Sequence, residues 1–339
     1  GIVRARYGPD ALERVGYTGA LHTPLRASLL APLMLPPFLA RLRAVAAREA
    51  AEFRPDVVHA HWWMPAGRIA RRLSVPYVVT SHGTDVRLLE KSMWRRLAAP
   101  VLRDAARVTT VSEFLAGDVR RLMPGVSDSI VVTPMPIDLA HFERGRQATK
   151  MSPPRVLFAG NLVESKGVDV LIDAIAILRG RGVACELAIV GAGPEESRLR
   201  ARASRLALGD AVRWSGFVSQ RDIPEQYGAA TVTVLPSRGQ AEGLGLVLAE
   251  ALLAGSAVVG TAAGGIPEIV VDERTGLIAK DGDAQDLARQ IERLLTDGTL
   301  RARTIVEGQA RVRAAHDPRT AAARFIALYT AISRRSGSP

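Results

Sequence analysis

Residues 236–255 read PSRGQAEGLGLVLAEALLAG, a glycine-rich turn that runs directly into an apolar helical pattern. A β-branched run of strand length precedes the turn at residues 231–235, and another apolar run follows at residues 257–260. The predicted order is therefore strand, loop, helix and strand. This order places Glu242 in the loop at the carboxyl end of a strand and Glu250 about two helical turns further along.

The same alternation extends over the second half of the chain. Apolar runs of strand length lead into glycine-containing loops and then into patterns of helical period. The expected strands are residues 155–159, 186–190, 212–214, 231–235 and 257–259, and the expected helices include residues 168–179, 283–295 and 319–332. Strands that alternate with helices indicate a parallel sheet whose ligands bind at the carboxyl ends of its strands.

The first half has an array of the same kind. Its expected strands are residues 56–60, 77–80, 107–111 and 130–133, and its expected helices are residues 40–53, 66–73 and 92–106. The sequence therefore predicts an α/β protein with two Rossmann-like parallel-sheet domains that face each other across a cleft. A cleft between domains is the usual place for a small-molecule site.

The boundary between the halves lies where periodicity stops. Residues 146–154 are polar, contain two prolines and are expected to form a linker. We expect a first domain at residues 1–145, a second domain at residues 155–318 and a C-terminal helix at residues 319–334. That last helix is a candidate to pack back on the first domain.

Composition narrows the class of protein. Of 339 residues, 47% are hydrophobic and 5% aromatic, which suits a folded α/β protein. The single cysteine, Cys185, lies in an apolar run, so we expect a small strand residue, no internal disulfide and a cytoplasmic setting. Of the net charge of +11, +9 belongs to residues 1–150. The excess basic residues could face an anionic lipid or a phosphorylated acceptor, or they could form an ordinary solvated surface. Nucleic acid is not an expected partner, because aromatic residues are not interleaved with the basic ones.

No run approaches the roughly 20 apolar residues that cross a bilayer. The longest candidate, residues 29–39 (LLAPLMLPPFL), is interrupted by three prolines. Beside Arg26, Arg41 and Arg43 it could enter the inner membrane interface as a peripheral contact. The alternative that the pattern favours is a buried helix and loop.

Several motifs occur in a fixed order. They are GNLVESKGVDVLI (160–172), IVGAGP (189–194), Gly216-Phe217, Pro236-Ser237, the pair Glu242 and Glu250, GGIPE (264–268) and Thr275-Gly276. Together they resemble the nucleotide-sugar half of glycosyltransferase family 4, a family of retaining GT-B enzymes. The match covers nearly all of residues 155–295. The first half resembles the family more loosely, through PDVVHA (55–60), PYVVTSHG (76–83), Thr110-Val-Ser112 and IDLAHF (137–142).

The resemblance implies a role for individual residues. It makes His82, Lys166 and Glu242 catalytic, with Glu242 on the sugar and Glu250 on the ribose. The donor-binding residues that it implies are Asn161, Gly191, Gly193, Gly216, Phe217, Val218, Gly243, Leu244, Gly245, Leu246 and Glu250. It further implies a UDP-, GDP- or ADP-sugar donor, no cofactor, no metal, and a lipid or glycan acceptor such as one used in cell-envelope polysaccharide biosynthesis.

The residue types suit this chemistry even without the family resemblance. A glycosyl donor leaves as a nucleoside diphosphate, so the site must stabilise phosphate charge that grows in the transition state. Lys166 supplies a point charge, and the N–H groups at the start of a helix after Gly243 supply dipoles. Carboxylates can accept hydrogen bonds from sugar and ribose hydroxyls.

Some features depart from the family or suggest another chemistry. Many members carry arginine where this chain has Asn161, which puts a second cationic phosphate contact in doubt. Arg238 is a candidate replacement, although a solvated loop arginine is the plainer interpretation. No carboxylate nucleophile is clearly placed, and Asp85 and Glu242 are the only candidates.

Three further patterns compete with this interpretation. His59, His61 and His82 could form a zinc site, but no acidic or cysteine ligand accompanies them. The pair Asp281 and Asp283 is expected in a turn and does not imply a metal. Ser112 lacks the flanking glycines of a nucleophile elbow.

Other functions stay open at this point. The same cleft could serve a sugar-nucleotide epimerase or a glycan phosphorylase, and a non-enzymatic two-lobed sugar-binding protein would share the sheet arrangement. Family members usually begin with a strand, a glycine-rich loop and a helix, which are not found before Ile2. We therefore expect the first domain to be incomplete at its start, in which case activity could be absent while donor binding persists. The oligomeric state does not follow from the sequence.

Overall fold

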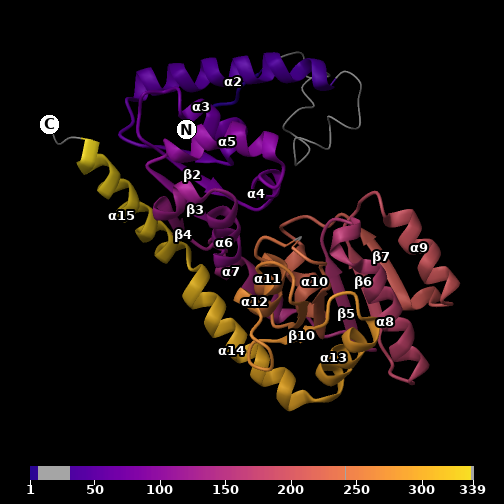
Figure 1. The fold of residues 1–339 in the computed structure, drawn as a ribbon. Helices are drawn as coiled ribbons and strands as arrows, with labels where there is room; N and C mark the ends of the chain where they lie inside the picture. The colour runs from indigo at the N-terminus through magenta and orange to yellow at the C-terminus, as the bar shows by residue number, and fades with distance from the viewer. Residues whose placement is uncertain (7–30, 241, 337–339) are drawn as a thin grey trace. The chain divides into compact units, whose positions relative to one another are not determined.

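The computed structural model describes residues 1–6, 31–240 and 242–336. Its contacts divide the chain into two compact units, each with its own sheet (Figure 1). The first unit comprises Gly1–Thr109, Val119–Val131 and Ala327–Pro339, and the second comprises Thr110–Asp118 and Val132–Ile326. The domain limits inferred from the sequence stay a prediction.

The first sheet has four strands in chain order, and β1 pairs with β2 in parallel. Its strands are β1 (Val58–His61), β2 (Tyr77–Ser81), β3 (Arg107–Thr110) and β4 (Ile130–Val132). The helical segments around it are α2 (Ala31–Phe53), η1 (Trp63–Gly67), α3 (Arg68–Ala70), α4 (Thr84–Leu88), α5 (Ser92–Arg103), α6 (Glu113–Leu122) and η2 (Pro124–Ser129). Every residue of β2 is buried, as expected for a strand inside a parallel sheet.

The helix predicted at residues 66–73 is confirmed only for its first part, because residues 71–73 form turns. The chain there forms the π-helical segment η1 and then the single turn α3. Trp62 has a φ of 66°, and the buried Trp63 ring donates from Nε1 to the backbone oxygen of Asp85 at 2.9 Å. The helical segment thus begins at Trp63, before the predicted start, and it is irregular there because the backbone at Met64 is extended and Pro65 has no N–H to donate.

The expectation of a buried helix and loop over residues 29–39 is also wrong for the part that the structure describes. Helix α2 begins at Ala31 and continues through Pro36 and Pro37. Both prolines are exposed, so water can satisfy the carbonyl groups that lose their intrahelical partners. Leu33 is 69% exposed, and no residue from 33 to 39 is buried.

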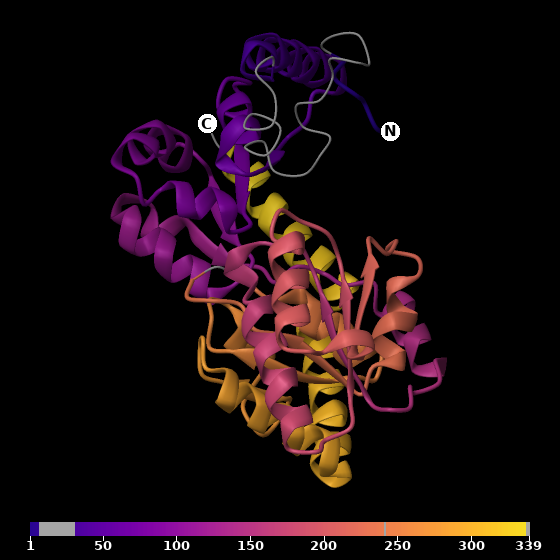
Figure 2. The ribbon, with the colours of Figure 1, turned by 90° about the vertical axis from the view of Figure 1, so that its right-hand side faces the viewer.

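The second unit contains a six-stranded sheet in the order β10-β9-β8-β5-β6-β7, with parallel pairing throughout. Its strands are β5 (Arg155–Ala159), β6 (Glu186–Val190), β7 (Val212–Gly216), β8 (Val232–Leu235), β9 (Ala257–Thr261) and β10 (Leu277–Ala279). Its helices are α7 (Leu139–Glu143), α8 (Val168–Gly180), α9 (Glu196–Arg205), α10 (Ile223–Ala229), α11 (Leu246–Leu253), α12 (Ile266–Ile269), α13 (Ala284–Thr296) and α14 (Gly298–His316). Figures 1 and 2 show the strands of this sheet lying between helices.

The core of the second unit explains why these elements form. Leu171, Ile172, Ile175 and Leu178 lie on α8 and are fully buried. Helix α8 packs against α13, and all five residues of both β5 and β6 are buried. Helices thus cover the central strands, which accounts for the continuous apolar runs in the sequence.

Two long helices, α14 and α15, lie at the C-terminal end of the chain. Helix α14 is absent from the sequence-based prediction because its apolar residues do not follow a clear helical period. Its start is nevertheless marked locally, since the Asp297 side chain accepts from the N–H of Leu300. Helix α15 (Pro318–Ser336) follows, and its residues are divided between the two units.

Candidate functional site

The candidate site lies at the carboxyl end of the second sheet, where the loops after the neighbouring strands β5 and β8 meet. Lys166 ends the 3-10 turn η4 (Glu164–Lys166) after β5, and Glu242 lies in the loop after β8. Their side chains are in contact, with 2.5 Å between Lys166 Nζ and Glu242 Oε2. The fold therefore brings together two of the residues predicted from the sequence.

Glu242 is held by more than the lysine. The hydroxyl of Ser237, which is fully buried, donates to Glu242 Oε2 at 3.0 Å. The Lys166 and Glu242 side chains are 22% and 14% exposed, so both charges are only partly hydrated. The charges of a pair this shielded interact more strongly than those of a surface pair, because water screens them less.

Two glycines allow the loops to approach this closely. A Cβ on Gly167 would lie 2.0 Å from the Pro236 oxygen, and a Cβ on Gly264 would lie 1.9 Å from the Glu242 oxygen. Both have positive φ values, 65° and 55°. The Ser112 hydroxyl also supports the loop by donating to the Gly243 oxygen at 2.7 Å. Neither the contact of Ser112 nor that of Ser237 was predicted from the sequence.

Helix α11 begins directly after Glu242-Gly243-Leu244. Its N-cap residue, Gly245, has a φ of 82°, and no side chain caps the helix. The first turn, from Leu246 onward, contains no acidic residue. A helix start with uncapped N–H groups and a positive dipole end favours an anion.

Glu250 lies one turn further along α11. Tyr227 on α10 donates its hydroxyl to Glu250 Oε2 at 2.9 Å. Burial raises the pKa of Glu250, while the hydrogen bond from Tyr227 and the nearby His141 act in the opposite direction. Burial likewise holds the pKa of Tyr227 well above its ordinary value, so the hydroxyl stays protonated and orients the carboxylate. This contact of Tyr227 with a candidate site residue was not predicted from the sequence.

The loops after β5, β6 and β7 are joined by backbone contacts. Gly191 N donates to the Gly216 oxygen at 2.7 Å, and a Cβ on Gly191 would lie 1.9 Å from the Gly160 oxygen. A Cβ on Gly193 would lie 2.3 Å from the Leu162 oxygen. Asn161 belongs to the same set of loops, and Phe217 is 83% exposed. Gly191 and Gly193 are therefore required by the close packing of these loops, and the exposed ring of Phe217 is available for stacking.

The interpretation of Arg238 as a solvated loop charge is wrong. Its Nη2 lies 2.9 Å and 3.0 Å from the two carboxylate oxygens of Asp169, in the first turn of α8. Asp169 is separated from Arg238 by 69 residues, so the local sequence carries no sign of this pair.

In the first unit, three histidine rings lie together at the ends of β1 and β2. His61 Nδ1 is 2.8 Å from His82 Nε2, and His59 stacks on His61. His59 contacts the Tyr329 hydroxyl through Nδ1 and Thr80 through Nε2, at 2.6 Å each. In the described parts of the chain, no group of three or more His, Cys, Asp or Glu residues is arranged to hold a metal ion.

Asp85 supports the loop that carries His82. Its Oδ1 accepts from the N–H of His82 at 3.0 Å and from that of Gly83 at 3.2 Å. Asp85 is 4% exposed, and burial raises its pKa. A buried carboxylate that binds its own loop is poorly placed for the nucleophilic role considered from the sequence.

The histidines predict a pH-dependent stability of the first unit. Burial lowers the pKa of both His59 and His82 to about 4, from 6.5, with a further lowering by the neighbouring histidines. Between these values the unfolded chain binds more protons than the folded one, so the free energy of unfolding must fall as the pH falls from 6.5 towards 4. Urea unfolding at pH 7 and pH 5 measures this.

The double variant His59→Gln/His82→Gln is the control for that measurement. The carboxylates contribute equally to both proteins, so the loss between pH 7 and pH 5 should be smaller in the variant. Equal losses in the two proteins would contradict the assignment to these histidines.

Across the described residues, no helix has both the length and the apolar character needed to span a bilayer.

Comparison with known proteins identifies the family. The model described as "Glycosyl transferases group 1" matches residues 141–311, and the model described as "Glycosyltransferase Family 4" matches residues 2–141. The chain is similar to the amylovoran biosynthesis glycosyltransferase AmsK of Erwinia amylovora, with 30% identity over 270 residues, covering 75% of this chain and 64% of that protein. It is also similar to the D-inositol 3-phosphate glycosyltransferase of Acidothermus cellulolyticus, with 34% identity over 293 residues, covering 78% and 64%.

This chain therefore spans less than two thirds of the length of these two relatives. A solved structure supports the fold: Anabaena Alr3699/HepE in complex with UDP has a TM-score of 0.74 and 22% identity, and the match covers 89% of this chain and 84% of that one. The predicted architecture of two parallel-sheet α/β domains is confirmed. The chain belongs to the glycosyl transferases of group 1, with a glycosyltransferase family 4 segment in its first half and the GT-B fold.

Proposed function

We propose that the protein transfers a sugar from a nucleoside diphosphate sugar to an acceptor hydroxyl, with retention of configuration and without a metal ion. One observation carries the proposal. Lys166 and Glu242 are in contact beside the uncapped start of α11, and a half-buried carboxylate, Glu250, follows on the same helix. A cation and helix N–H groups suit a diphosphate, and two carboxylates suit the hydroxyls on either side of it.

In this reaction the departing diphosphate acts as the base that deprotonates the acceptor hydroxyl. The bond between sugar C1 and the diphosphate oxygen breaks, the acceptor oxygen bonds to C1 on the same face, and the acceptor proton passes to the departing phosphate. Negative charge grows on the diphosphate as C1–O breaks, so Lys166 and the α11 dipole stabilise the transition state more than the bound donor. No protein nucleophile is required by this route.

The remaining site residues would place the donor. Glu242 accepts from sugar hydroxyls, Glu250 accepts from the ribose diol, and Phe217 stacks on the base. The family resemblance assigns His82 a role at the donor sugar. These assignments follow the resemblance to the family and the positions of the side chains within each unit.

The acceptor is proposed to be lipid-linked or a cell-envelope glycan. The basic first half and the exposed Leu33 on α2 support a peripheral contact with anionic lipid. Retention on liposomes that contain anionic lipid at low salt is expected, with neutral liposomes as the control. Equal behaviour on both kinds of liposome would contradict the membrane part of the proposal alone.

Calorimetry with UDP, GDP and ADP tests the donor site. We expect one of the three to bind with 1:1 stoichiometry in the presence of EDTA, and UDP is the first probe because HepE of the same fold holds it. The corresponding sugar nucleotide is then supplied with candidate acceptors, and NMR of the product reports the anomeric configuration. Failure of all three diphosphates to bind would rule the proposal out, whereas an epimerised nucleotide sugar or a sugar phosphate would indicate the other enzyme classes on this fold.

A further inference from the structure

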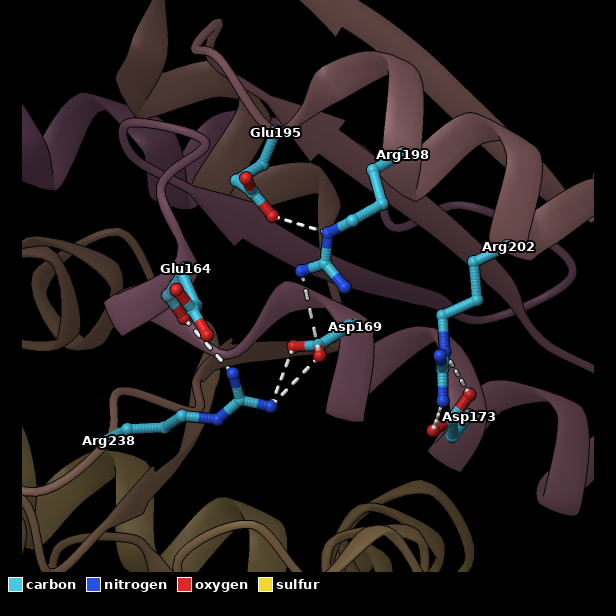
Figure 3. A network of polar contacts seen from close by, with 7 residues as sticks. All are labelled: Glu164, Asp169, Asp173, Glu195, Arg198, Arg202 and Arg238. Carbon is cyan, nitrogen blue, oxygen red and sulfur yellow. Dashed lines mark hydrogen bonds and ion pairs between the residues drawn. The ribbon is translucent and has the colours of Figure 1, made fainter.

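Arg238 joins the two loops that carry Lys166 and Glu242. It lies in the loop after β8, four residues before Glu242, and its backbone N–H donates to the Ser165 oxygen at 2.9 Å. Its guanidinium donates through Nη1 to the Glu164 oxygen at 3.3 Å and through Nη2 to both oxygens of Asp169. Figure 3 shows the guanidinium reaching Glu164 and Asp169 together.

These contacts fall on both sides of Lys166. Glu164 and Ser165 precede the lysine in η4, and Asp169 follows it in the first turn of α8. Between them Gly167 adopts a left-handed conformation at the start of α8, a joint where the backbone can change direction. Arg238 therefore bridges the turn at three points and limits where Lys166 can lie.

Asp169, the charged partner of Arg238 in this bridge, lies near a second arginine. Asp169 is 13% exposed and also faces Arg198, whose Nη2 is 3.8 Å from Asp169 Oδ2. Arg198 in turn pairs with Glu195 at 2.5 Å. If Arg238 is removed, Arg198 remains close to Asp169, so the carboxylate is not left as an unpaired charge. The second unit should fold without Arg238.

We propose that Arg238 is a positioning residue for the donor reaction, acting through Lys166. It holds the η4 turn against the loop of Glu242, so that the Lys166 ammonium is already placed when the diphosphate arrives. This inference rests on the proposed function, in which Lys166 binds the donor diphosphate. Placement in advance matters because a displacement of about 1 Å in a site of this kind is enough to lower the rate strongly.

A second arginine–aspartate pair, whose aspartate lies on α8 like Asp169, supplies a matched control. Arg202 of α9 donates to both oxygens of Asp173 at 2.6 Å and 2.5 Å, one turn along α8 from Asp169. Figure 3 shows this pair beside the first. Each guanidinium contacts both oxygens of its aspartate, Arg202 through Nε and Nη2 and Arg238 through Nη2 alone. The exposure is similar, 34% for Arg202 against 32% for Arg238, but the Arg202 pair joins α8 to α9 and does not involve η4. Loss of either pair should therefore cost similar stability.

The test is a double-mutant cycle on diphosphate affinity. We expect Arg238→Gln to raise the Kd of the nucleoside diphosphate by about 10-fold. Arg238→Lys should raise it by less, because the ammonium keeps the positive charge beside Asp169 but cannot bridge both partners. Arg202→Gln should change the melting temperature by a similar amount and leave the Kd unchanged. In a Lys166→Met background, Arg238→Gln should cause no further loss of affinity.

The outcomes separate three interpretations. An additive loss in the Lys166→Met background would show that Arg238 contacts phosphate itself, and an equal rise in Kd for Arg202→Gln would show a general stability effect; either overturns the inference. An unchanged Kd in Arg238→Gln, with Lys166→Met still weakened, would also overturn it and leave the proposed function intact. If wild-type protein binds no diphosphate, the proposed function fails first.

Discussion

Lys166→Met is expected to lower kcat/KM for the sugar nucleotide by about 10³-fold, or about 4 kcal/mol of transition-state stabilisation. Methionine keeps most of the length of the side chain and removes the charge. The loss should appear both in diphosphate affinity and in kcat, because the phosphate charge that Lys166 opposes grows as the C1–O bond breaks. Steady-state kinetics with calorimetry of the bare diphosphate separates the two effects.

Glu242→Gln makes this prediction sharper. Lys166 Nζ and Glu242 Oε2 lie 2.5 Å apart, so the carboxylate competes with the phosphate for the lysine ammonium. Removing the negative charge of Glu242 should leave the affinity for the bare diphosphate equal or higher, while turnover of the sugar nucleotide falls because a sugar contact is weakened. Lys166→Met should thus lower the diphosphate affinity, whereas Glu242→Gln should not.

Lys91→Met is a suitable control, since Lys91 is exposed and lies before α5 in the first unit. It should leave both measurements unchanged. A Lys166→Met enzyme with wild-type diphosphate affinity, or a Glu242→Gln enzyme that loses that affinity as strongly as Lys166→Met, would show that the roles of the pair are assigned wrongly.

Glu250→Gln is expected to weaken donor affinity by about 10- to 100-fold, the range for losing a charge-assisted pair of hydrogen bonds. Gln can still accept from Tyr227 through its amide oxygen, so the helix should keep its packing. The affinity of the wild-type protein should also decline as the pH falls through the pKa of Glu250, which burial raises, because only the ionised carboxylate accepts from both ribose hydroxyls. This decline should be absent from the Glu250→Gln variant.

Tyr227→Phe tests the geometry of the same contact. It leaves the charge of Glu250 in place and removes the hydroxyl that orients it at 2.9 Å, so we expect a smaller loss than in Glu250→Gln. Glu225→Gln, on the exposed side of α10, is the control. Donor affinity unchanged by Glu250→Gln at pH 7 would remove Glu250 from the donor site.

Much of the second unit could be predicted from local sequence. Strands β5 and β6 have the predicted bounds, and α8 and α13 differ from them by one residue at most, because fully buried strands and amphipathic helices leave periodic patterns. The failures occurred where that signal is weak or overridden. The helix predicted at residues 66–73 is helical only as far as Ala70, and the helical segment begins earlier than predicted, at Trp63. Helix α14 has no clear apolar period and was missed.

The candidate site divides in the same way. Lys166, Glu242, Glu250 and the glycines of the loops could be named from the sequence, because their types and spacing around strand ends indicate the chemistry. Their partners could not. Tyr227 lies in none of the motifs, the contact between Ser237 and Glu242 does not follow from the Pro236-Ser237 motif, and Arg238 appeared to be an ordinary loop arginine.

The sequence by itself determined the order of strands, loops and helices and the residues at the strand ends, since these depend on periodicity and turn chemistry over a few neighbours. The tertiary structure alone decided which side chains meet. Lys166 and Glu242 are 76 residues apart, and Arg238 and Asp169 are 69 residues apart. Such pairs form only after the order of strands in the sheet places the loops after β5 and β8 side by side, and that order is set by packing of the whole unit, which no local pattern encodes.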